Sequence, residues 1–383
     1  MTRHIAYAAG ARSDYGIVRP YLKNLSQAEG VDLEILVTGS LLSREFGHAV
    51  NRIEEDGLPV GCRIDIDVDP AGSEAVLHSM ALAMDGFGRH FASHLYDLLI
   101  LLGDRYEMLS VATAAAMSRI PILHLHGGEA TFANADEFIR HSITKMSLFH
   151  FTATEAYRQR IIQLGESPDR VFYLGALGAE NALHFDEVKV DTRLRQLTET
   201  PYLLVLFHPE TLTGDDPKEQ TAALLEALEE IDVPPVFLGT NADAGGGIIR
   251  RMIRDFTDEK TGARYFENLA PDAYHYLLKH ALCLVGNSSS GLIEAPSLET
   301  VTVNIGHRQD GRVRGSSVID VPCKKEGIVS AVRRVISGGE AVAFENPYYR
   351  PEAARNYTET TLRLLDRLQT EPLAKVFYDI PMP

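Results

Sequence analysis

The chain has 383 residues and a formal net charge of −16 at pH 7, and 45% of its residues are hydrophobic. This length exceeds a single ordinary hydrophobic core, so we expect a globular protein of two domains. The excess of acidic side chains argues against nucleic acid and an anionic membrane surface as partners. No apolar stretch approaches the roughly 18–20 residues of a membrane span, and the start shows no signal-peptide pattern. Because three isolated cysteines offer no disulfide framework, we expect a cytoplasmic protein.

Short apolar runs alternate with helical patterns along the whole chain. The first series of expected strands is HIAYAAG (4–10), DLEILVTG (32–39), LYDLLILLG (95–103), IPILHLHG (120–127), LFHFTAT (148–154) and VFYLGAL (171–177). The second is YLLVLFH (202–208), PPVFLGT (234–240), ARYFENL (263–269), ALCLVGN (281–287) and VTVNIG (301–306). Alternation of this kind predicts parallel sheets that are covered by helices on both faces.

A polar, charged stretch at 184–201 separates the two series, and a helical pattern covers Pro351–Leu368 near the end. We therefore predict a first domain at 1–180, a second at 181–350, and a C-terminal helix and tail at 351–383. Each domain is expected to be doubly wound, with its ligand at the carboxyl ends of the strands.

Acidic and basic side chains gather after two of the expected strands. Asp104 and Arg105 follow the third apolar run, and Glu129 and Asp136 follow the fourth. Because these strand ends open on the ligand crevice of a parallel sheet, we expect catalytic groups here. At least one of these carboxylates should be buried with a shifted pKa, as is common at active sites.

The same segment is also compatible with a metal site or with surface salt bridges. His124 and His126 lie on one face of a strand with Glu129 close behind, yet no H-E-x-x-H pattern occurs and a third zinc ligand must be guessed. We therefore predict neither a metal nor another cofactor. The helical spacings Asp136/Arg140 and Glu137/His141 are also compatible with solvated salt bridges.

Further motifs carry polar groups with alternative structural explanations. GARSDYG (10–16) supplies Arg12 and Asp14 after the first strand, although Asp14 could simply form an Asx-type turn. FHPET (207–211) ends the first strand of the second series, and its His208 could equally be a buried structural histidine. Asn241 opens NADAGG, which makes a good turn unaided.

A serine-rich turn, GNSSSGLIEAP (286–296), links a strand to a helix in the second series. Helix N-termini present unpaired N–H groups and a partial positive charge to anions such as a diphosphate. Ser288 and Ser289 can add hydroxyl donors, and Glu294 could accept from ribose hydroxyls. The alternative is a plain serine-capped helix.

Together these segments resemble the hydrolysing UDP-N-acetylglucosamine 2-epimerases of bacterial sialic- and legionaminic-acid synthesis. The hallmarks are the GDR turn (103–105), the GGE turn (127–129) and the helix DEFIRHSITK (136–145). Seven further motifs occur in the expected order: GARSDYG, EFG (45–47), QLGESPDRVFYLGALG (163–178), FHPET (207–211), NADAGG (241–246), GNSSSGLIEAP and NIGHRQDGR (304–312).

The resemblance implies a GT-B fold, in which two doubly wound, Rossmann-like domains flank a central cleft and the C-terminal helix crosses back to the first domain. It implies a UDP-sugar as substrate and a homodimer or higher homo-oligomer. The implied catalytic residues are Asp104, Glu129, Asp136, His208 and His126. The implied substrate- and nucleotide-binding residues are Arg12, Asp14, Arg105, Asn241, Asn268, Ser288, Ser289, Glu294 and Arg308.

The implied reaction converts UDP-N-acetylglucosamine to N-acetylmannosamine and UDP, by elimination to a glycal and rehydration. One alternative is the same chemistry on UDP-2,4-diacetamido-2,4,6-trideoxyglucose, in the legionaminic-acid branch. Further alternatives are a non-hydrolysing epimerase, a GT-B glycosyltransferase and a non-catalytic UDP-sugar binder, which fold analogy alone does not separate.

The chain departs from the family pattern around the sugar. His126 stands where the best-known members have a catalytic glutamate, and residues 39–42 read GSLL, without the usual histidine. ATFANA (130–135) is bulkier than the usual turn, and Asn268 replaces a histidine that often faces the uracil. Nucleotide binding is therefore better supported than the identity of the sugar.

Overall fold

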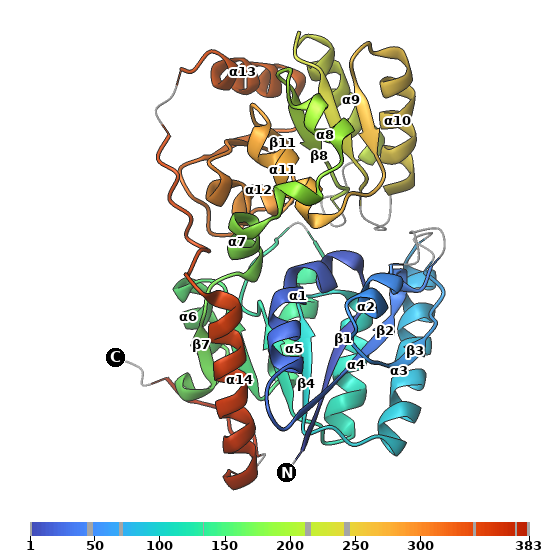
Figure 1. Ribbon diagram of the computed structural model, residues 1–383, viewed down its shortest axis with the longest axis vertical. Coiled ribbons are helices and arrows are strands. Elements are labelled where there is room, and N and C mark those ends of the chain that lie inside the picture. Colours follow the sequence, from blue (N-terminus) through green and yellow to red (C-terminus); the bar gives the residue numbers. More distant parts are fainter. Residues whose placement is uncertain are drawn as a thin grey trace. The chain divides into compact units, whose positions relative to one another are not determined.

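A computed structural model describes residues 2–43, 49–68, 72–132, 134–210, 216–240, 246–339, 342–371 and 374–380 (Figure 1). The chain forms two compact units. Unit 1 comprises Met1–Glu129, Asp136–Leu177 and Arg350–Pro383, and unit 2 comprises Ala130–Ala135 and Gly178–Tyr349. The short segment 130–135 thus groups with unit 2, although the chain on either side of it belongs to unit 1.

The described strands of unit 1 form a seven-stranded parallel sheet in the order β3-β2-β1-β4-β5-β6-β7. These strands are β1 Arg3–Ala9, β2 Val31–Thr38, β3 Val60–Ile64, β4 Leu98–Leu102, β5 Ile122–Leu125, β6 Phe149–Thr152 and β7 Val171–Tyr173. The winding direction reverses between the neighbouring strands β1 and β4. Such a switch point is where open parallel sheets place their ligands.

The helices of unit 1 cover both faces of this sheet. They are α1 Arg12–Ser26, α2 Asn51–Glu55, α3 Ser73–Ser93, α4 Tyr106–Met117, α5 Asp136–Met146, α6 Glu155–Gln163 and α14 Ala353–Thr370, with short 3-10 segments η1 Gly39–Leu41 and η2 Pro168–Arg170. The alternating sides of β4 explain its all-apolar sequence. Leu98 and Ile100 pack in one core with α1 and α14, whereas Leu99 and Leu101 pack in the other with α3 and α4.

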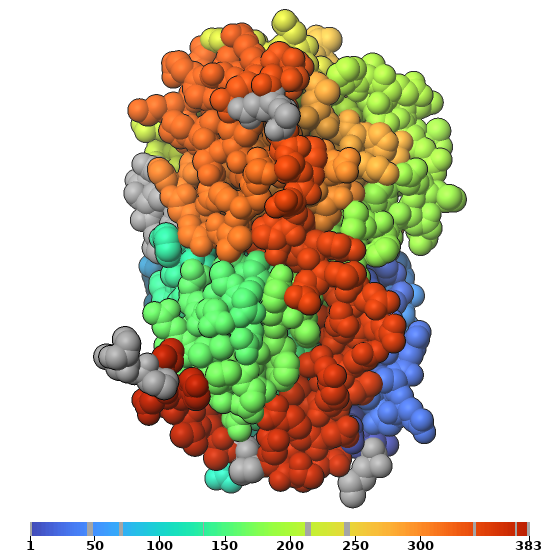
Figure 2. All heavy atoms as spheres, turned by 90° about the vertical axis from the view of Figure 1, so that its left-hand side faces the viewer, coloured from blue at the N-terminus to red at the C-terminus, as the bar shows by residue number. Residues whose placement is uncertain are grey.

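The C-terminal helix α14 belongs to unit 1, where it packs on α1. The Tyr357 hydroxyl donates to the Gly175 carbonyl at 2.8 Å, and the hydroxyls of Tyr21 and Thr361 lie 2.8 Å apart. Figure 2 shows α14 and the tail 374–380, both in red, against the green segment that contains β6, α6 and β7. The end of the chain is therefore part of the structure that supports the unit 1 sheet.

Unit 2 contains a six-stranded parallel sheet in the order β10-β9-β8-β11-β12-β13. Its described strands are β8 Leu203–Leu206, β9 Pro235–Leu238, β10 Arg264–Phe266, β11 Leu284–Gly286, β12 Thr302–Ile305 and β13 Val318–Val321. The helical segments are α7 Leu177–Asn181, which starts at the unit boundary, η3 Ala182–His184, η4 Glu187–Lys189, α8 Thr192–Leu197, α9 Pro217–Glu229, α10 Gly246–Glu259, α11 Pro271–His280, α12 Ser290–Ile293, η5 Ala295–Leu298 and α13 Lys325–Ile336. Here the switch point lies between β8 and β11.

The two sheets confirm the predicted pair of doubly wound α/β units. Within the described ranges, no helix combines the length and the apolar character that would let it cross a membrane.

Candidate active site

The turns after β4 and β5 in unit 1 are shaped by glycines. Gly128 has a φ of 78°, and a Cβ there would lie 2.4 Å from the carbonyl oxygen of Tyr157 on α6. A Cβ at Gly127 would lie 2.9 Å from Nδ1 of His124. Larger residues would push this turn off the sheet, so the GGE sequence is required for the close approach that places Glu129.

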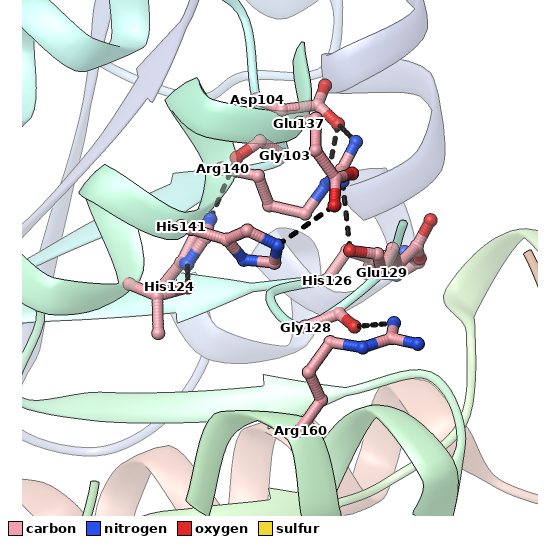
Figure 3. A network of polar contacts seen from close by, with 11 residues as sticks. Gly103, Asp104, His124, His126, Gly128, Glu129, Glu137, Arg140, His141 and Arg160 are labelled. Carbon is pink, nitrogen blue, oxygen red and sulfur yellow. Dashed lines mark hydrogen bonds and ion pairs between the residues drawn. The ribbon is translucent and has the colours of Figure 1, made fainter. Parts of the chain in front are cut away.

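Arg140 on α5 joins these two turns (Figure 3). Its side chain is 0% exposed. Nε donates to Oδ2 of Asp104 at 2.9 Å and Nη2 donates to the same oxygen, while Nη1 donates to the Glu129 carbonyl at 2.9 Å and to Glu137 at 3.1 Å. The alternative of a solvated helix pair therefore does not apply to Arg140, because this guanidinium points inward. The Glu137–His141 pair does form, at 3.2 Å.

His126 and Glu129 form a second polar pair in the same network. Nδ1 of His126 lies 3.2 Å from Oε1 of Glu129, and the two side chains are 11% and 3% exposed. Nε2 of His126 is buried and has no hydrogen-bond partner among the described residues. His126 also has a φ of 61°, a left-handed conformation that is uncommon for residues other than glycine.

His124 has a structural role. Its Nε2 lies 2.7 Å from the Gly103 carbonyl oxygen and its Nδ1 lies 3.1 Å from the Thr144 hydroxyl, so both ring nitrogens have partners. Burial lowers the pKa of His124 to about 3, which keeps the ring neutral. Among the residues that the structure describes, no group of three histidines, cysteines or carboxylates is placed to hold a metal.

The switch point of unit 1 carries a further charged group. Asp14 is the third residue of α1, and its side chain accepts from the N–H of the N-cap residue Ala11 at 2.9 Å, a helix-capping contact rather than an Asx-type turn. Burial raises the pKa of Asp14 to about 6, with nearby Arg105 opposing the shift and Glu107 reinforcing it. Arg105 Nε donates to Glu107 at 2.5 Å. Arg12, the first residue of α1, is exposed.

Glu107 is a candidate that the sequence analysis did not select. Its side chain is 1% exposed, and its Oε2 has no hydrogen-bond partner within the described ranges. A Cβ at Gly10 would lie 2.6 Å from the Glu107 Oε1, so the glycine at the end of β1 makes room for this carboxylate. The signal was present as the glutamate two residues after the GDR turn, at the start of α4.

Asn287 joins the two strands at the switch point of unit 2. Its side-chain oxygen accepts from the His208 N–H at 2.7 Å, and its amide nitrogen donates to the His208 carbonyl at 2.8 Å. Nδ1 of His208 lies 3.0 Å from the Thr240 hydroxyl. Burial, reinforced by the charge of Arg308, holds the pKa of His208 well below its usual value. The imidazole is therefore neutral at pH 7.

The serine-rich turn after β11 opens only a short helix. The helix it opens, α12, has four residues and passes directly into η5, so few peptide dipoles align behind the turn. Ser289 occupies the N-cap position without a side-chain capping bond, and the Ser288 hydroxyl lies 3.4 Å from the Ser290 N–H. Glu294 Oε2 lies 3.1 Å from the Ser290 hydroxyl and 3.2 Å from His275 Nε2.

Glu210 is a second residue that the sequence analysis missed. Oε1 accepts from the backbone N–H groups of His307 at 2.8 Å and Arg308 at 3.1 Å, and Oε2 is buried without a partner in the described part of the chain. A Cβ at Gly306 would lie 2.4 Å from Oε1. Glu210 therefore organises the loop that carries Arg308, whose Nη1 donates to the Asn287 carbonyl at 3.1 Å.

Comparison with known proteins identifies the family. The family model described as UDP-N-acetylglucosamine 2-epimerase matches residues 23–361. The chain belongs to this family. The polysialic acid biosynthesis protein P7 of Escherichia coli is 42% identical, over 99% of this chain and 98% of that protein. A UDP-N,N'-diacetylbacillosamine 2-epimerase (hydrolyzing) of Legionella pneumophila is 35% identical, over 88% of this chain and 90% of that protein.

Solved structures of the epimerase family share the fold. The crystal structure of UDP-GlcNAc 2-epimerase from Neisseria meningitidis bound to UDP-GlcNAc has a TM-score of 0.79 at 17% identity and covers 94% of this chain and 100% of that chain. At this identity the likeness concerns the fold alone. It confirms the GT-B-like pair of α/β domains that the sequence motifs implied.

The remaining epimerase candidates are placed as follows. Asp136 is the first residue of α5, one turn before Arg140, and is partly buried. Asn268 is exposed in the loop after β10. Asn241 and the motif at 45–47 lie outside the described residues. Unit 1 thus brings together Asp104, Glu129 and His126 through Arg140, and unit 2 brings together His208, Arg308 and the serine-rich turn through Asn287.

Proposed function

We propose that this chain is a hydrolysing 2-epimerase that converts UDP-N-acetylglucosamine and water to N-acetylmannosamine and UDP. The observation that carries the proposal is the polar network at the ends of β4 and β5. It contains a carboxylate bound to a buried guanidinium, Asp104 with Arg140, beside a buried imidazole–carboxylate pair. The hydrolysing relative from Legionella supports the release of a free sugar.

The chemistry explains why such a network is needed. The C2 proton of an N-acetylhexosamine is not acidic, because no carbonyl carbon is attached to C2. Its removal becomes feasible when the anomeric C–O bond breaks before it or with it. The site must therefore balance a cationic sugar, accept the C2 proton and stabilise departing UDP. Asp104, Glu129, Asp136 and His126 are the acid and base candidates of unit 1.

The unit 2 residues are suited to binding UDP and to stabilising it as the leaving group. Ser288 and Ser289 offer hydroxyl and backbone donors at the end of β11, and Arg308 supplies positive charge beside them. His208 is neutral, and a neutral imidazole still donates one N–H, which suits hydrogen bonding to the leaving diphosphate. We assign nucleotide binding to these residues together with Glu294, and assign Arg12, Asp14, Arg105, Asn241 and Asn268 to substrate contacts.

The reaction then has two steps. In the first, a base takes the C2 proton, the C–H electrons form the C1–C2 double bond, and the C1–O electrons leave with UDP. In the second, water adds its hydroxyl to C1 while a proton is delivered to C2. This proton arrives on the face of the sugar opposite to the one from which the first proton was removed. Two different groups handle the two protons, because inversion at C2 needs removal and delivery on opposite faces.

UDP-2,4-diacetamido-2,4,6-trideoxyglucose is the second candidate substrate. Its common name is UDP-N,N'-diacetylbacillosamine, the sugar nucleotide in the name of the Legionella relative, which is 35% identical to this chain. The departures from the family pattern, at His126, at 39–42 and at 130–135, also concentrate around the sugar rather than the nucleotide.

Incubation with each UDP-sugar in deuterated water tests the proposal. We expect UDP and a free sugar that carries deuterium at C2, by mass spectrometry and NMR, from one of the two substrates. A returned UDP-sugar with inverted C2 would mean a non-hydrolysing epimerase, and a sugar transferred to an acceptor would mean a glycosyltransferase. Binding of UDP-sugar with no product from either substrate would refute an enzymatic role.

A further inference from the structure

The His126–Glu129 pair combines three features that a structural histidine does not need. One ring nitrogen faces a buried carboxylate at 3.2 Å, and the other is buried with no partner among the described residues. The backbone of His126 is left-handed, with a φ of 61°. By contrast, His124 has partners for both nitrogens and lies within β5.

We propose that His126 is the base that takes the C2 proton, and that Glu129 is its positioning residue. The assignment rests on the proposed epimerase function. Glu129 Oε1 accepts from Nδ1–H, which leaves the lone pair on Nε2, an atom with no hydrogen-bond partner in the described part of the chain. Nε2 takes the proton from C2, the C–H electron pair forms the double bond, and the C1–O pair leaves with UDP. The imidazolium that results lies beside the Glu129 carboxylate, which balances its charge in a buried place.

The contacts of Asp104 favour a different task for that carboxylate. Both Nε and Nη2 of Arg140 donate to its Oδ2, so one oxygen already carries two charge-assisted hydrogen bonds. This oxygen of Asp104 is therefore already engaged by Arg140, whereas Nε2 of His126 has no hydrogen-bond partner among the described residues. Asp104 therefore supplies negative charge opposite the cationic sugar, while His126 moves the proton.

The backbone conformation supports the assignment independently of the hydrogen bonds. Strained backbone persists where the surrounding structure holds it, and such residues cluster at active sites. Arg119 provides a matched reference within unit 1, because it has nearly the same φ, 60°, but is exposed in the connection between α4 and β5. Glycine at either position removes the steric cost of the left-handed conformation.

The test uses the full chain and the UDP-sugar that it turns over, with four variants: His126→Gly, His126→Gln, Glu129→Gln and Arg119→Gly. We expect both His126 variants to lose at least roughly 100-fold in kcat, the scale of losing a general base, while their affinity for UDP is unchanged. Added imidazole should restore part of the turnover of His126→Gly, because the glycine leaves space for it, but none of the turnover of His126→Gln. Arg119→Gly should keep full turnover.

Glu129→Gln should lower kcat by about 10-fold or more with little change in KM, since the amide still fills the space but does not balance the imidazolium. Full turnover of His126→Gln would overturn the assignment of His126 as the base but not the proposed function. The same holds if imidazole fails to rescue His126→Gly while UDP still binds. If the unaltered chain releases no sugar from either UDP-sugar, the proposed function fails and takes this assignment with it.

Discussion

Replacing Arg140 by methionine should destabilise unit 1 more than any substitution of a surface arginine. The change removes at least four hydrogen bonds from a side chain that is 0% exposed, including two to Asp104 and one each to Glu137 and the Glu129 carbonyl. Removing one partner of a buried ion pair costs about 3–5 kcal/mol. Because the carboxylates of Asp104 and Glu137 are 20% and 26% exposed, water can reach them in part. We therefore expect Arg140→Met to lower the free energy of unfolding by about 3 kcal/mol, the lower end of this range.

Urea unfolding followed by circular dichroism measures this cost. The double variant Arg140→Met/Asp104→Asn should recover about 1–2 kcal/mol relative to the sum of the single variants, because residues in one ion-pair network couple. Arg89→Met is the matched control, since Arg89 is 80% exposed and pairs only across one helical turn with Asp85. If Arg140→Met unfolds at the same urea concentration as Arg89→Met, the network does not hold the turns together as we argue.

Three further predictions concern unit 1. Burial lowers the pKa of His124 to about 3, from 6.5, so its stabilising contribution is complete above pH 6.5 and falls by about 1.4 kcal/mol per pH unit as the pH drops towards 4; His124→Gln should show a smaller loss of urea stability between pH 6.5 and 4.5. Lys375→Met should lower the melting temperature and speed hydrogen exchange at the end of α5, because Lys375 donates to the buried Glu166 at 2.8 Å and to α5 carbonyls; unchanged exchange there would contradict the clamp. Gly128→Ala should destabilise far more than Gly57→Ala, since both have positive φ but only Gly128 has a carbonyl 2.4 Å from the added Cβ.

The architecture could be predicted because the strand pattern is strong. LLILL at β4 is apolar at every position, which only a strand covered on both faces tolerates, and the two cores divide its residues as that pattern requires. The grouping of 130–135 with unit 2 could not be predicted, because it depends on a local contact. The Phe132 N–H donates to the Asp310 carbonyl at 3.2 Å, between residues distant in sequence.

The sequence predicted which strand ends carry the polar groups, but it did not predict which of these side chains contact one another. Asp104 and Glu129 follow strands and do lie in one network. Helical spacing, however, offers Arg140 only neighbours on α5, whereas its closest acid is Asp104 on another turn. Glu107 and Glu210 were missed for a related reason. Each is held by a glycine-lined space or by backbone N–H groups of a distant loop, and such contacts leave no periodic signal.

The histidine at position 126 need not remove a negative charge from the site. The resemblance implies a glutamate at that position in the best-known members, whereas here the carboxylate of Glu129 lies 3.2 Å from the imidazole and is 3% exposed. The pair as a whole therefore keeps one carboxylate and adds a ring that can hold a proton. In the proposed mechanism the reacting atom is therefore Nε2 of His126, and the carboxylate of Glu129 stays on the other side of the ring at Nδ1. The proposed elimination therefore does not require a glutamate at position 126, because Glu129 supplies the charge that balances the imidazolium.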